Sequence, residues 1–248
     1  MSDQDAVSPV ARRAGVIGSY RRGVRIKAQP GVATAEMEDD VHHFQVALRH
    51  ADGVITAVEA AAPRTPWVTC PGALMQLKTL GGLRLEDVKA LSRSERFEHC
   101  LHLFDLALLA ASRAQDAPFE RVYRIDADHD AAQPLMRMWR DGIELLSWRV
   151  DDGRVQGSRY DGAALAELSR RLGELGADEA EAVLILRRAS LISFVRTVDL
   201  DAVSSSNALR ASPGATCYAK QPVRLDEAER AVGSSRDFWT QGTWPLEP

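Results

Sequence analysis

The sequence has no long hydrophobic run. Its 248 residues are 45% hydrophobic and 27% charged, a composition typical of globular proteins rather than disordered or fibrous ones. The apolar run 106–111 is far shorter than the roughly 20 residues that span a bilayer, and it is flanked by Asp105 and Arg113. The first residues include acids, and no apolar stretch of the kind found in secretory signals follows them. We therefore predict a cytoplasmic protein with no membrane partner.

Positive charge is not in excess either. Lys and Arg total 31 against 35 Asp and Glu, which gives a net charge of -4. The densest basic segment contains Arg12, Arg13, Arg21, Arg22 and Arg25, and we interpret it as a solvated arm. A nucleic-acid interface needs a basic excess on one element, so the sequence predicts no nucleic-acid partner.

Cysteine is scarce. Cys70, Cys100 and Cys217 are an odd number at wide spacing and form no CxxC pair, which excludes a zinc ribbon and disfavours a disulfide framework. The GxGxxG and GxxxxGKS/T motifs of dinucleotide and nucleotide sites are missing, as is the GxSxG elbow of serine hydrolases. We therefore expect no cofactor.

Two blocks of β-capable runs are present. In the first block two runs are joined across Asp52-Gly53, and in the second across Asp141-Gly142. These dipeptides supply the positive φ angles that a tight hairpin turn requires. Both blocks therefore predict antiparallel hairpins.

Helical patterns lie between and after these blocks. The strongest covers 96–113, and another covers 225–232. Antiparallel hairpins with separate helices indicate an α+β fold. We predict a flexible lead-in over 1–18, then one α+β domain over 19–248, a curved antiparallel sheet with inserted and C-terminal helices.

The histidines gather in one stretch, because five of the six fall between residues 42 and 102. Asp39 and Asp40 closely precede His42, and a histidine held by a carboxylate is the usual general base near neutral pH. By period two, His42 shares the inward face of its strand with Phe44. His102 lies on a helix that must bury one face. We predict that His42 and His102 approach one another and line one cavity.

Other interpretations of these side chains stay open. First-row metals accept imidazole and carboxylate ligands, although the spacing here differs from HExxH. The candidate metal donors are His42, His99, His102, Glu98 and Asp105. Two of the cysteines, Cys70 and Cys100, are either nucleophiles or small core residues.

Four short motifs resemble a known family. They are VHHF at 41–44, PWVTCPG at 66–72, Leu80-Gly81 and HCLHL at 99–103. Together they resemble the bacterial domain-of-unknown-function 2889 family over roughly residues 20 to 150. Single family positions are matched by His42, Cys70, Gly81, Cys100 and His102. The family's Asp, Met, Gly and Thr are replaced here by His43, Phe44, His99 and Leu101.

The resemblance implies a link to the catabolism of aromatic or steroid-like compounds. Together with the residues, it favours a cofactor-independent lyase that removes formaldehyde or carbon dioxide from a hydrophobic, lignin-derived aromatic molecule. In this hypothesis His42 deprotonates a hydroxyl, His102 acts as the acid, and Tyr123 or an arginine holds the phenolate. The residues expected to contact the substrate are His43, Trp67, Cys70 and His99.

Two other functions compete with the lyase. The sheet and its helix would enclose an apolar ligand without catalysis, with the histidines as polar anchors. Alternatively, the chain is a metal-dependent hydrolase or dioxygenase. The sequence leaves the oligomeric state open, a homo-oligomer included.

Overall fold

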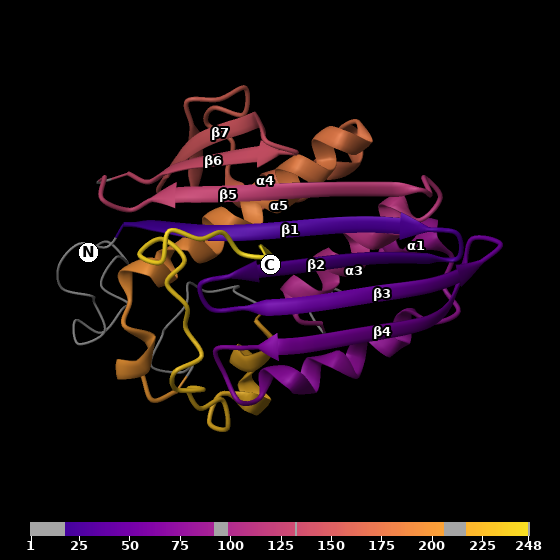
Figure 1. Ribbon diagram of the computed structural model, residues 1–248, viewed down its shortest axis with the longest axis horizontal. Coiled ribbons are helices and arrows are strands. Elements are labelled where there is room, and N and C mark those ends of the chain that lie inside the picture. The colour runs from indigo at the N-terminus through magenta and orange to yellow at the C-terminus, as the bar shows by residue number, and fades with distance from the viewer. Residues whose placement is uncertain (1–17, 92–98, 132, 206–216, 248) are drawn as a thin grey trace.

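A single antiparallel sheet of eight strands forms the centre of the protein, in the order β4-β3-β2-β1-β5-β6-β7-β8 (Figure 1). The computed structural model describes residues 18–91, 99–131, 133–205 and 217–247. The α+β class and the curved antiparallel sheet are confirmed. Nearly all of the predicted lead-in, 1–17, lies outside the described residues.

The sheet consists of two four-stranded meanders that meet at its centre, where β1 pairs with β5. The first meander contains β1 (Ser19–Gln29), β2 (Val32–Asp39), β3 (His43–Ala51) and β4 (Val54–Arg64). The second contains β5 (Phe119–Asp128), β6 (Leu135–Arg140), β7 (Ile143–Asp151) and β8 (Arg154–Gln156). Each meander is followed by helices, so the two halves of the chain share one plan.

The predicted hairpin turns are confirmed. Asp52 and Gly53 have φ angles of 50° and 77°, and Asp141 and Gly142 have 50° and 86°. Both central residues of each turn are thus left-handed, the conformation that matches the twist of two paired strands. The turns therefore fix the register of β3 with β4 and of β6 with β7.

The helices lie mainly on one face of the sheet (Figure 1). Their bounds are α1 (Leu85–Ala90), α3 (Leu101–Arg113), α4 (Leu165–Leu168) and α5 (Ala177–Ile192). The short 3-10 helices cover Cys70–Leu74, Gln76–Leu80, Leu172–Glu174, Ser193–Thr197, Leu200–Ala202, Tyr218–Lys220 and Pro222–Arg224. No described helix is long and apolar enough to cross a membrane.

One core runs under both meanders, and its first half lies between α3 and the first meander. Inward residues of β3 follow period two, and Phe44, Val46 and Leu48 are buried, as predicted. Leu103 and Phe104 of α3 are buried in the same cluster. This packing sets α3 against β1, β2 and β3.

Two helix predictions need correction. The strongest helix begins at Leu101 rather than 96, with His99 and Cys100 before it and 96–98 outside the described residues. The helix predicted over 225–232 is absent, because Arg230 instead forms an isolated bridge with Trp67 and donates to the carbonyl of Pro66 at 2.8 Å. Burial of that guanidinium outweighs the local helical pattern.

The C-terminal segment, residues 230–247, crosses the other face of the sheet (Figure 1). Leu246 accepts a hydrogen bond from Arg25 on β1 and donates its N–H to Glu38 on β2. Pro245 lies directly over Gly23. The sheet is thus covered by helices on one side and in part by this segment on the other.

The close approach at Gly23 gives a test of this arrangement. A Cβ added there would lie 2.7 Å from the carbonyl oxygen of Pro245, so Gly23→Ala must displace the C-terminal segment. We expect the free energy of unfolding to fall by about 1–3 kcal/mol in urea titrations. The matched control is Gly173→Ala, where no atom lies within 4 Å. Equal stability of both variants would contradict the described packing.

Candidate active site

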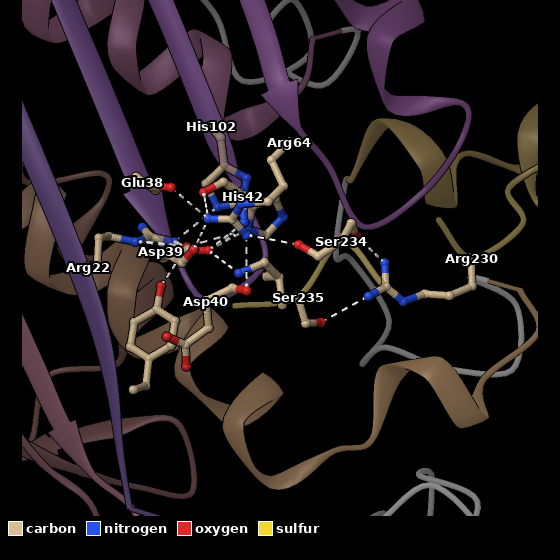
Figure 2. A network of polar contacts seen from close by, with 12 residues as sticks. Arg22, Glu38, Asp39, Asp40, His42, Arg64, His102, Arg230, Ser234 and Ser235 are labelled. Carbon is tan, nitrogen blue, oxygen red and sulfur yellow. Dashed lines mark hydrogen bonds and ion pairs between the residues drawn. The ribbon is translucent and has the colours of Figure 1, made fainter. Parts of the chain in front are cut away.

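The turn between β2 and β3 presents the candidate active site. Asp39 ends β2, and its backbone N–H donates to the carbonyl of His42 at 2.8 Å. Arg22 on β1 lies opposite Asp39 in the strand register. His102 is the second residue of α3, the helix that packs on β1, β2 and β3. These four side chains converge on one point (Figure 2).

Asp39 is the centre of this group. Its carboxylate is fully buried and accepts hydrogen bonds from both sides of the turn. From β1 it accepts from the Tyr20 hydroxyl at 2.7 Å and from Arg22 Nη2 at 2.6 Å. From the turn it accepts the backbone N–H groups of Val41 and His42 at 2.9 and 2.7 Å. The buried charge is therefore matched by donors on two elements.

The ring of His42 is oriented by the same carboxylate. Burial opposes ionisation of Asp39, but the charges of His42 and Arg22 outweigh it and hold the pKa of the carboxyl well below its usual 3.8. An ionised carboxylate only accepts hydrogen bonds, so Nδ1 of His42, 3.1 Å away, carries the proton. Whenever the ring loses its second proton, the lone pair is on Nε2, because Nδ1–H stays bound to Asp39. This is the arrangement of a general base.

His102 stands beside His42, and the prediction that the two approach one another is confirmed. Their ring centroids are 4.3 Å apart. Arg22 Nη2 lies 3.3 Å from Nε2 of His102, and because a guanidinium only donates, this nitrogen is the acceptor and Nδ1 carries the proton. Burial, followed by the charges of His42 and Arg22, holds the pKa of His102 well below its usual 6.5. His102 is therefore neutral at neutral pH.

A small cavity adjoins His102 between α3 and α5. Its volume is about 20 Å³, which is room for one water molecule. Polar lining comes from Arg22, His102, Asp105 and Arg188, and the rest is aliphatic. The prediction that His42 shares a cavity with His102 is wrong for this cavity, because His42 does not line it. His42 packs instead against the ring of Phe44, with centroids 5.7 Å apart. A larger polar hollow of about 110 Å³ lies at the other end of α3, away from the histidines.

Asp40 points away from this group into a second buried environment (Figure 2). Its carboxyl is 4% exposed, and its nearest cation is Arg196, at 3.7 Å. Arg196 is bound more tightly to Asp237, at 2.7 Å. Burial and then the charge of Asp39 raise the pKa of Asp40 to about 8. The two adjacent aspartates therefore differ in protonation at neutral pH.

Tyr123, predicted to hold the substrate, lies in a different buried network. Its hydroxyl donates to Glu181 of α5, which also accepts from Arg113 and Arg121. Burial and the charge of Glu181 raise the pKa of Tyr123 above its usual value. The hydroxyl of Tyr123 therefore belongs to a network in the second half of the sheet, apart from the histidine pair.

The four predicted substrate contacts are spread over several places. His43 lies on the outer face of the sheet, 2.8 Å from Glu36. His99 is buried against the ring of Phe104 at 5.5 Å. Trp67 and Cys70 share a small core with Val41, the residue before His42. Burial raises the pKa of the Cys70 thiol well above its usual 9.0, which leaves it unreactive.

The donor set for a metal is present but already engaged. Donor atoms of Asp39, His42 and His102 all lie within 4.8 Å of one another. However, both oxygens of Asp39 accept hydrogen bonds, and the Arg22 cation touches Asp39 and His102. A divalent ion would have to displace the guanidinium of Arg22, whose side chain is 3% exposed. The chemistry of the surroundings thus suits proton transfer better than metal binding.

Two residues of this site are not predicted from the sequence. Arg22 was assigned to a solvated arm, and that interpretation is wrong for this residue, which is buried. The sequence signal that indicates burial of Arg22 is its place in the period-two alternation with Tyr20, Val24 and Ile26. Arg64 ends β4 and donates to the carbonyls of the Asp39–His42 turn, a contact that no local pattern predicts.

One family model matches the part of the chain that contains these residues. The model of a family described as "Protein of unknown function (DUF2889)" matches residues 22–115. This stretch contains Arg22, Asp39, His42, Arg64 and His102, whereas the C-terminal segment lies outside it. No curated protein matches the chain.

The first prediction from the site concerns Asp39. Asp39→Asn leaves the buried Arg22 without its counter-charge, and we expect a loss of about 3–5 kcal/mol in urea unfolding at pH 7. Because the folded-state pKa is depressed, this contribution is present above pH 3.8 and is lost as the pH falls through the folded value. The difference between wild type and variant should therefore shrink in acid.

The control for this measurement is Glu59→Gln. Glu59 pairs with Arg49 on the surface, where both side chains are 57% exposed, so its loss should cost about 0–1 kcal/mol. An Asp39→Asn variant as stable as this control would show that the carboxylate is not the centre of the group.

The second prediction concerns Asp40, whose contribution to stability changes with pH in the opposite direction to that of Asp39. Between pH 3.8 and about 8 the folded state keeps a proton on Asp40 that the unfolded state releases, so stability falls as pH rises across this window. Asp40→Asn removes this effect. We expect thermal melts of the variant to match wild type near pH 4 and to exceed it most above pH 8. A variant that is less stable at pH 8 would refute the raised pKa.

Proposed function

We propose a function from the site itself, because the family model that matches residues 22–115 is described only as a protein of unknown function, DUF2889. The protein is a cofactor-independent lyase that acts on a hydrophobic aromatic molecule by proton transfer. The observation that carries this proposal is the Asp39–His42 pair, a buried ionised carboxylate fixing the imidazole tautomer. In its specific form, the reaction releases formaldehyde or carbon dioxide from the substrate.

In this proposal three side chains, His42, His102 and Arg22, share the work. Nε2 of His42 takes the proton from a primary hydroxyl, and the O–H electron pair forms the carbonyl of formaldehyde. The carbon–carbon bond breaks, and its electrons pass into a conjugated carbonyl or ring of the substrate. His42 then returns the proton to the substrate carbon from which formaldehyde has left. The released molecule is formaldehyde, and no electrons are gained or lost overall.

The role predicted for His102 changes in this mechanism. A neutral His102 is a weak acid at neutral pH, since its pKa is held below 6.5, so it contributes a hydrogen bond from Nδ1–H rather than a transferred proton. The permanent cation of the site is Arg22, which contacts both Asp39 and His102. Such a group stabilises negative charge that develops in a transition state.

The size of the cavity sets a condition on this proposal. An aromatic ring does not fit into about 20 Å³, so binding beside His102 requires α3 and α5 to move apart. Leu106 and Leu109 of α3 and Leu184 and Ile185 of α5 would then supply apolar contacts. Ligand-dependent hydrogen exchange along these helices detects this movement.

We also propose a reducing, cytoplasmic location. The three cysteines are free thiols, and two of them are buried. Unpaired cysteines are typical of proteins that work in reducing compartments.

The experiment that tests the proposal is a turnover screen. Purified protein is incubated with phenolic dimers that carry a primary alcohol and with hydroxylated aromatic acids, and formaldehyde and carbon dioxide are measured. His42→Ala should lower the rate by about 10²-fold or more while ligand affinity is kept. His50→Ala, at the far end of β3, serves as the control.

Three outcomes would overturn the lyase. Tight ligand binding with no product from any compound would favour the non-catalytic binding protein. Stoichiometric metal in the purified protein, with activity lost on chelation, would favour the metal-dependent hydrolase or dioxygenase. Wild-type rates from a folded His42→Ala variant would remove the histidine from the mechanism.

A further inference from the structure

One guanidinium holds the backbone of the turn that presents the Asp39–His42 pair. Arg64 ends β4, and its side chain is 9% exposed. Nη2 donates to the carbonyl of Asp39 at 2.5 Å and to that of His42 at 3.2 Å. Nη1 donates to the carbonyl of Asp40 at 3.0 Å. Three carbonyls within four residues are thus satisfied by one side chain (Figure 2).

The same guanidinium also reaches the C-terminal segment. Nη1 of Arg64 donates to the carbonyl of Ser234 at 3.2 Å. Ser234 is held in turn by Arg230, whose Nη1 donates to its hydroxyl at 2.6 Å. The backbone N–H of Arg236 donates to the carbonyl of Asp40 at 2.7 Å. Arg64 therefore links the active-site turn to the C-terminal segment, where Ser234 lies 170 residues after Arg64 in the sequence.

The position of Asp39 depends on this turn. The backbone N–H groups of Val41 and His42 reach the carboxylate only while the turn keeps its shape. A guanidinium fixes several acceptors at once because its donors form a rigid planar fork, which an ammonium group lacks. Glu38, at 3.1 Å, balances its charge on the outer side.

We propose that Arg64 is a positioning residue for the Asp39–His42 pair and couples that pair to the C-terminal segment. Arg64 does not contact the ring of His42 in any described hydrogen bond. It acts by fixing the carbonyls of the turn, so that the backbone and ring donors of His42 meet the Asp39 carboxylate together. Its importance for catalysis rests on the proposed function, whereas its effect on the pair is measured without turnover.

The test follows the Nδ1 proton of His42 by NMR. This proton lies in the hydrogen bond to Asp39, so its exchange with water reports how well the pair is held. In Arg64→Ala we expect exchange at least about tenfold faster, since several hydrogen bonds to the turn are lost. Arg64→Lys keeps the charge without the fork and should give an intermediate rate.

The matched control is Arg49→Ala. Arg49 lies on the neighbouring strand and pairs with Glu59 on the surface, so its loss should leave the His42 proton unchanged. Far-UV circular dichroism confirms that each variant is folded at the temperature of measurement. If Arg64→Ala does not fold, Arg64→Lys decides the question alone.

An unchanged exchange rate in a folded Arg64→Ala or Arg64→Lys variant would overturn the positioning role. This result would overturn the positioning role even if the protein shows turnover. Conversely, faster exchange in a protein that converts no substrate would confirm Arg64 and refute the proposed lyase. With an active protein, Arg64→Ala should lower kcat and leave KM nearly unchanged.

Discussion

The buried negative charge of Asp39 is the constraint on which the site depends. Burying an ionised carboxylate away from water costs free energy unless hydrogen-bond donors surround it. Here Tyr20 and Arg22 come from β1, and Val41 and His42 come from the turn. The pairing of β1 with β2, the shape of the turn and the tautomer of His42 all follow from satisfying this one group. Arg22, which donates to this carboxylate, also donates to Nε2 of His102.

Local patterns were sufficient to predict much of the fold. Asp52-Gly53 and Asp141-Gly142 specify their turns through backbone angles, which depend on those residues alone. The alternation in β3 follows from one buried face. The approach of His42 and His102 was also predictable, because a helix beside a half-apolar strand must pack on it.

The remaining features depend on contacts between distant segments. Arg22 resembles a surface residue until its strand is placed opposite Asp39. Arg64 and Ser234 meet only because the C-terminal segment crosses the sheet. The 225–232 pattern is helical in isolation, yet Arg230 instead binds the carbonyl of Pro66 and the carboxylate of Asp201, at 2.8 and 2.9 Å. Periodicity carries no information about such pairings.

The central claim is that Asp39 is ionised and fixes both rings, directly for His42 and through Arg22 for His102. Long-range ¹H–¹⁵N spectra of the histidine side chains at pH 7 test it most directly. The account predicts a proton on Nδ1 of His42 and a neutral His102 with its proton on Nδ1. A proton on Nε2 of His102, or a charged His102 at this pH, would contradict it.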